Sequence, residues 1–230
     1  MKSKKKIILL ALALCIAISI VSVGALSNRN SMDKKDLLKA ANTIKTSLQE
    51  KADKVEVATA NGISIYQDEI ELRKKLAMIA FDMDEQEAYK DTIKSLARNK
   101  VLYKMAQDMG LAFTEEQALE ASLRERDLVS SDEKALENTN SYIQALGLTE
   151  EQYWTDYHAK EKQQYLSIQK LKAYFTDEAV KEGKLSKVEF HTQDSSKQYK
   201  DYLKEVMKEI EDSISIDIKD ESYKEKFNQK

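Results

Sequence analysis

The chain has 230 residues, 42% of them hydrophobic and 33% charged, with one cysteine, five glycines and no proline. This composition suits one folded domain or two small ones, and it excludes a scaffold held by internal disulfides or a glycine-rich phosphate loop. Without the four lysines of the first six residues, 33 of the 37 Lys+Arg remain against 40 Asp+Glu, a net charge of −7. That balance argues against nucleic acid and anionic lipid surfaces as partners.

The N-terminus has the pattern of an export signal. Its four lysines precede residues 7–25, which carry no charged side chain, and Val23-Gly24-Ala25 supplies small residues for cleavage before Leu26. The stretch is also long enough to span a bilayer uncut. Residues 1–25 are therefore predicted to be a signal peptide or a membrane anchor. In both cases the rest of the chain is expected outside the cytoplasm, either secreted or held at the outer face of the membrane.

The exported part opens with a predicted polar linker over residues 26–35. Apolar residues at helical spacing then predict a helix over Asp36–Ala52. The alternation in Val55–Thr59 predicts a strand, and Asn61-Gly62 is a strong signal for a hairpin turn.

The central part is predicted to be a run of helices. The first spans Gln67–Phe81, and the next and best delimited spans Asp84–Leu111. Asp84 and Glu87 form a capping-box pattern, and Gly110 favours the left-handed conformation that ends helices. Similar signals predict three further helices, beginning at Thr114, after Ser131, and at Glu150, with the last reaching about Lys181.

The C-terminal part is predicted to return to the first strand. A short extended segment (Lys187–Thr192) and a helix (Asp194–Asp212) precede an alternating strand, Ser213–Lys219. Because an isolated strand needs a partner, we expect it to pair with Val55–Thr59. The predicted fold class is mainly α, a multi-helix domain over residues 36–219 with a small β-sheet joining its N- and C-terminal strands, followed by a charged, frayed tail over 220–230.

Several stretches together carry a family resemblance. They are Ala60-Asn61-Gly62 with Ile63-Ser64-Ile65, Leu96–Ala106, Met109-Gly110-Leu111 with Thr114-Glu115-Glu116, and Leu146–Trp154. Over about residues 55–180 the chain resembles the N-terminal chaperone domain of exported foldases of the SurA and PrsA type, which is related to the peptide-binding part of trigger factor. The resemblance implies a helical domain that binds unfolded or extended polypeptide.

Two departures from that family matter. Tyr66 stands where the family usually has a capping Ser or Thr, so that helix start is expected to be less well held. Many family members also carry a parvulin prolyl isomerase, and Lys187–His191 resembles its opening. Only 39 residues follow His191, which is too few for that module. We therefore expect a chaperone domain without an isomerase, and keep a degenerate prolyl isomerase as an alternative.

Eight side chains are candidate contacts for a bound polypeptide. Methionine repacks readily around different shapes, and tyrosine and tryptophan combine an apolar body with a polar tip. Each candidate also has a structural alternative, as core or as a packed corner, and Met105 and Met109 are predicted to be core. The peptide-binding candidates are Met78, Phe81, Met83, Tyr89, Tyr103, Tyr153, Trp154 and Tyr157.

The sequence offers no pattern for catalysis or for a cofactor. His158 and His191 are the only histidines, neither has metal-ligand spacing, and both are predicted to be structural or surface residues. There is no nucleophile-elbow motif. The predicted function is an exported, membrane-proximal holdase that binds unfolded or partly folded exported proteins without catalysis, metal or cofactor, and its acidic surface favours basic, apolar clients. The alternative is an envelope assembly subunit that binds one specific protein.

Overall fold

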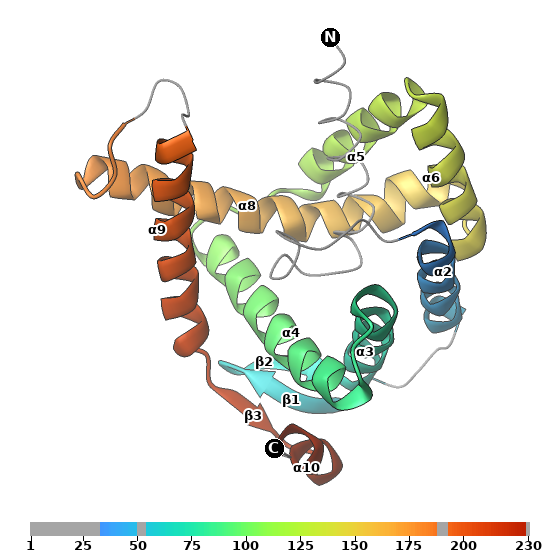
Figure 1. Cartoon of the computed structure of the whole chain (residues 1–230), viewed down its shortest axis with the longest axis horizontal. Helices are drawn as coiled ribbons and strands as arrows, with labels where there is room; N and C mark the ends of the chain where they lie inside the picture. Colours follow the sequence, from blue (N-terminus) through green and yellow to red (C-terminus); the bar gives the residue numbers. More distant parts are fainter. Residues whose placement is uncertain (1–32, 50–53, 188–192, 229–230) are drawn as a thin grey trace.

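A three-stranded antiparallel sheet and a long helix packed on it organise the fold (Figure 1). The structure is a computed structural model, and it describes residues 33–49, 54–187 and 193–228. As predicted, it is mainly helical with one small sheet. The elements are α2 (Lys34–Gln49), β1 (Glu56–Ala60), β2 (Ile63–Tyr66), α3 (Gln67–Phe81), α4 (Glu85–Asp108), α5 (Glu115–Ser130), α6 (Glu133–Leu146), α7 (Glu150–Gln152), the π-helical turn η1 (Tyr153–Tyr157), α8 (His158–Lys181), α9 (Gln193–Asp212), β3 (Ile216–Ile218) and α10 (Glu221–Asn228).

The sheet joins the two ends of the described chain, as predicted. Its strand order is β2-β1-β3, and β1 pairs antiparallel with both neighbours. Asn61 and Gly62 both have positive φ, 47° and 81°, which is what a two-residue hairpin turn between β1 and β2 requires. Strand β3 is shorter than predicted, but Ala58 lies opposite Ile218, so the apolar residues of β3 contribute to the core beside β1.

Helix α4 (Glu85–Asp108) lies within its predicted span, and the Asp84 half of the predicted capping box caps its start. The Asp84 carboxylate accepts a hydrogen bond from the backbone N–H of Glu87 at 2.8 Å. At the other end Gly110 has φ 67°, and the N–H of Leu111 bonds back to the carbonyl of Ala106 at 2.8 Å. One face of the helix packs on the sheet, while its C-terminal part reaches α8 and α9.

The apolar side chains form three core clusters. One lies among α2, α3, α6 and η1, with Trp154 and Tyr142 at its centre. A second lies between the sheet, α4 and α10. The third is smaller: four buried residues of α4 and α8 form it, and half-buried residues of α9 pack against them. The four are Leu102, Ala106, Ile168 and Leu171.

The prediction of a frayed tail over residues 220–230 is wrong, because α10 folds back onto the second cluster. Asp220 Oδ1 caps the helix by accepting hydrogen bonds from the N–H and hydroxyl of Ser222, at 2.9 and 2.6 Å. Tyr223 and Phe227 then lie one turn apart on the same side, and Tyr223 is only 6% exposed. The folded domain therefore extends through Asn228.

The remaining boundaries differ in detail. Helix α2 begins at Lys34, inside the predicted linker, and is described as far as Gln49; residues 50–52 of its predicted span lie outside the described residues. Despite the missing Ser or Thr at Tyr66, α3 is held at its start because Glu69 Oε2 accepts the Tyr66 N–H at 3.0 Å. The predicted signal or anchor (1–25) and residues 188–192 of the predicted extended segment lie outside the described residues.

Candidate functional site

The structure divides the eight candidate residues among three places. Three of them form what we call the α3–α4 corner: Met78 is 37% exposed, and Phe81 and Met83 are half-buried. Asp82 ends α3 in the left-handed conformation (φ 53°), and Asp84 caps α4 directly afterwards. The two helices are therefore joined by a very short turn, which brings these apolar side chains together with exposed carboxylates.

Three other candidates are core residues. Tyr89 is 2% exposed, Tyr153 1% and Trp154 3%. The Tyr89 hydroxyl donates to the Tyr223 carbonyl at 3.2 Å, so this tyrosine fastens α10 to α4. Tyr153 packs edge-on against Trp154 with ring centres 4.9 Å apart. Their side chains are closed to a bound polypeptide in this structure.

Tyr153 and Trp154 therefore follow the structural alternative to peptide binding, a packed corner. Tyr157 completes it, half-buried and stacked on Tyr153 with ring centres 5.9 Å apart. Burial, and then the neighbouring Glu161 carboxylate, raise the pKa of the Tyr157 hydroxyl. This aromatic group fixes the π-helical turn η1 against α6 and α5 rather than forming a surface.

The eighth candidate, Tyr103, lies near the far end of α4, about 30 Å from the corner at 1.5 Å per residue. It packs against the third core cluster beside Met105 and Phe175, which are also half-buried. Two residues of α9, Met207 and Ile210, pack there too. Helix α9 crosses α8 and passes the C-terminal part of α4 on its way to β3 (Figure 1).

Helix α9 differs from the other long helices in how little of it is covered. It has 20 residues, and none of those whose burial the structure describes, Ser196–Asp212, is buried. In contrast, α8 has seven buried residues and α4 has nine. The apolar side of α9 carries half-buried residues at steps of three and four, and we call these, with Met105 and Phe175, the α9 surface. The α9 residues are Tyr202, Leu203, Val206, Met207 and Ile210.

Met105 and Met109, predicted to be core, differ from each other. Met105 is half-buried against two of the core clusters, whereas Met109 is 41% exposed at the end of α4.

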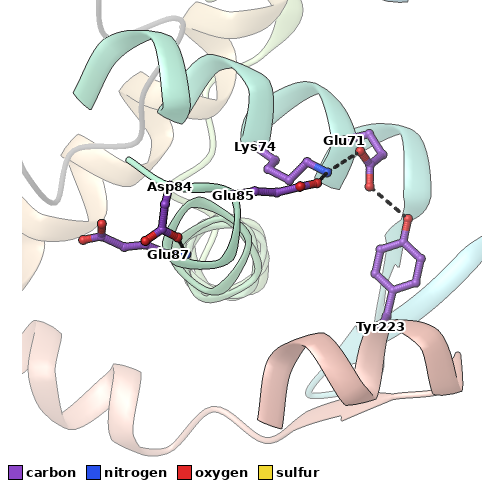
Figure 2. Close-up of polar contacts among 6 residues, drawn as sticks. All are labelled: Glu71, Lys74, Asp84, Glu85, Glu87 and Tyr223. Atoms are coloured by element: carbon purple, nitrogen blue, oxygen red, sulfur yellow. Dashed lines mark hydrogen bonds and ion pairs between the residues drawn. The ribbon is translucent and has the colours of Figure 1, made fainter. Parts of the chain in front are cut away.

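A polar chain that the sequence analysis did not find ties α10 to the α3–α4 corner. The Tyr223 hydroxyl donates to Glu71 at 3.2 Å, and Lys74 bridges Glu71 and Glu85, each at 2.8 Å (Figure 2). Burial acts to lower the pKa of Lys74, but its hydrogen bonds to the two carboxylates outweigh burial and raise it. Lys74 therefore stays charged. This chain spans 152 residues of sequence, so no local pattern could have shown it.

A second polar network lies between α5 and the start of α8. Ser122 donates to the Trp154 carbonyl at 2.6 Å and lies 2.9 Å from Nδ1 of His158. Nε2 of that histidine is 3.7 Å from Glu125, which is also ion-paired with Lys162. Burial lowers the pKa of His158 to about 4, with Glu125 opposing the shift and Lys162 adding to it.

This network has the residue types of a serine–histidine–acid triad but not its chemistry. Since the Ser122 proton is directed at a backbone carbonyl, the 2.9 Å contact requires Nδ1–H of His158 to be the donor. The histidine then has no lone pair facing the hydroxyl, so it cannot act as its base. Ser122 is also 0% exposed and His158 2%. As predicted, this histidine is structural, and it holds η1 against α5.

The part of the chain that the structure describes contains no cluster of His, Cys, Asp and Glu able to hold a metal ion. Within the same residues, no helix has both the length and the apolar character needed to cross a bilayer. Comparisons with protein-family models, with curated proteins and with solved structures find no match to this chain. Two surfaces with partly covered apolar residues are candidates for binding another molecule: the α9 surface and the α3–α4 corner.

Proposed function

We propose that the protein is an exported holdase that binds apolar segments of unfolded proteins on the α9 surface. The observation that supports this most directly is the incomplete burial of α9, a helix none of whose apolar side chains between Ser196 and Asp212 is fully buried. A soluble monomer rarely leaves a continuous apolar stripe open unless something binds there. The resemblance of residues 55–180 to exported foldase chaperone domains supports the same function.

The chemistry of the α9 surface suits varied clients. It combines Met105 and Met207, which adapt to different shapes, with two aromatic rings, of which that of Tyr202 has a polar tip. Covering about 300 Å² of apolar surface contributes roughly 7 kcal/mol, much of which offsets the lost freedom of the two chains. Binding is therefore weak and reversible, as a holdase that must release its client requires.

Charge keeps the complex soluble. The exported part carries a net charge of −7, and the outer side of α9 is a continuous run of exposed Lys, Asp and Glu residues. A client held on the apolar side is therefore surrounded by charged groups, which oppose further association of loaded molecules.

Aggregation of clients tests the proposal. Two unrelated proteins that aggregate on heating are followed by light scattering, alone and with the purified protein. The variant Leu203→Ser plus Val206→Ser removes apolar surface without touching Met207 or Ile210, which contact the core. The matched control is Leu128→Ser, a 59% exposed leucine on α5.

We expect the wild-type protein and the Leu128→Ser control to suppress scattering of both clients, and the double variant to lose most of this activity. A protein that suppresses neither client, but captures one folded partner, would instead be the assembly subunit. Phe81→Ala plus Met83→Ala tests the α3–α4 corner in the same assay. If this pair alone abolishes protection, the clients bind at the corner and not at α9.

A further inference from the structure

Beside the α9 surface, helix α8 carries a cation that its neighbours leave unpaired. Lys172 lies on α8 four residues after Ile168 and three before Phe175, so it shares the helix face that packs against α4 and α9. It is half-buried, and it forms no hydrogen bond or ion pair with any residue in the described ranges.

The carboxylate whose charge attracts Lys172 is already engaged. Glu211, in the last turn of α9, forms an ion pair with Arg98 of α4 at 2.8 Å. The Arg98 side chain is only 20% exposed. Glu211 itself is 42% exposed, so two cations share one solvated carboxylate, which leaves a local positive charge on a domain that is acidic as a whole.

The surroundings of Lys172 disfavour its charged form. Burial lowers its pKa, Arg98 lowers it further, and Glu211 acts in the opposite direction. A partly buried ammonium without a partner costs free energy that an incoming carboxylate would recover. The carboxylate would meet Lys172 beside apolar side chains, where ionic contacts are stronger than in water.

We propose that Lys172 selects clients by pairing with an Asp or Glu side chain set within an otherwise apolar segment. This inference rests on the proposed function and names the client class for the same surface. At this one position it reverses the expectation that basic clients are favoured, while the acidic exterior still repels strongly acidic chains. The preferred segment therefore has a single carboxylate among apolar residues. We assign a side-chain carboxylate and not a chain end, because the apolar side of α9 continues from its last turn, beside Arg98, back to Val206 and Leu203, so a client can continue past Lys172.

Peptide binding measured by fluorescence anisotropy tests the assignment. The probes are 12-residue labelled peptides with amidated C-termini and one apolar sequence, which differ only in a central Glu, Gln or Lys. With the purified wild-type protein we expect the Glu peptide to bind about tenfold more tightly than the Gln peptide, the size of one charge-assisted contact. The Lys peptide should bind more weakly than either. A fourth peptide, with central Gln and a free C-terminal carboxylate, should match the amidated Gln peptide.

Substitutions assign the preference to Lys172. Lys172→Gln should bind the Glu and Gln peptides equally, with the affinity for the Gln peptide unchanged, and Lys172→Arg should keep the preference. Lys204→Gln, at an exposed lysine of α9, is the control and should also keep it. If Lys172→Gln does not fold, loss of the tenfold preference at high salt in the wild-type protein is the result that supports an ionic contact.

The two proposals fail in different ways. If no peptide binds, the holdase function itself is refuted. If all peptides bind with equal affinity, or if Lys204→Gln removes the preference as fully as Lys172→Gln, the holdase function stands and the role of Lys172 is refuted. A gain in affinity from the free C-terminus alone would overturn the assignment to a side-chain carboxylate.

Discussion

Because His158 is buried, the free energy of unfolding should fall on acidification, and the pKa of this histidine sets the size of the fall. The ring is 2% exposed, and its pKa falls from 6.5 to about 4 because burial disfavours the charged imidazolium. Ser122, Glu125 and Lys162 are the polar groups that face it. The test compares how much stability the wild-type protein and His158→Gln lose when the pH is lowered from about 7.5 to about 4.5.

The sign and size of the effect follow from linkage. Between pH 6.5 and 4 the unfolded chain binds a proton at this histidine and the folded chain does not. Acid therefore favours unfolding, and the contribution of His158 is fully present above pH 6.5 and is lost as the pH falls toward 4. Each pKa unit corresponds to about 1.4 kcal/mol, so the loss between pH 7.5 and 4.5 is roughly 2 to 3 kcal/mol.

Urea unfolding followed by circular dichroism measures this loss at each pH. Other groups titrate similarly in both proteins, so the wild-type protein should lose roughly 2 to 3 kcal/mol more than His158→Gln over this range. Equal pH dependence in the two proteins would refute the reasoning. If His158→Gln does not fold, NMR titration of the ring in a His191→Gln background should still give a pKa well below 6, and a value near 6.5 would contradict the calculation.

The other predictions concern packing and the ends of elements. Leu171→Ala removes a side chain that is 0% exposed at the junction of α4, α8 and α9, and it should lower the free energy of unfolding by about 3 kcal/mol in urea titrations. Tyr223→Phe removes the hydroxyl that bonds Glu71 and should cost about 1 kcal/mol, whereas a loss below 0.3 kcal/mol, on the order of experimental error, would mean that the contact is not stabilising. Asp82→Gly relieves a positive φ of 53° and should raise the melting temperature slightly, while Asp82→Val should lower it.

The incomplete burial of α9 was not visible in its sequence. Its apolar residues recur at steps of three and four, which is the pattern of a helix packed against a core along its whole length. The structure supplies partners for only part of that side, namely Met207 and Ile210. Periodicity reports that a helix has an apolar side, but not whether other elements of the same chain cover it.

The candidate residues show the same limit. Phe81, Met83 and Tyr89 lie within nine positions of one another, and all were candidates for the same reason. Tyr89 is buried because α10 packs over it, and the residues of α10 lie more than 130 positions later in the chain. The wrong prediction for the C-terminal tail has a similar cause. Tyr223 and Phe227, which hold α10 on the core, stand among charged residues in the sequence, so the segment as a whole reads as polar.

The sequence by itself determined the elements that depend on neighbours along the chain. Asn61-Gly62 sets the hairpin, Asp84 and Gly110 limit the central helix, and the alternation of Ile216 and Ile218 with polar residues marks the returning strand. Only the tertiary structure decided which apolar residues remain open, which polar residues meet in networks, and that Lys172 is left without a partner. These outcomes depend on contacts between residues that are distant in the chain, and local propensity carries no information about such contacts.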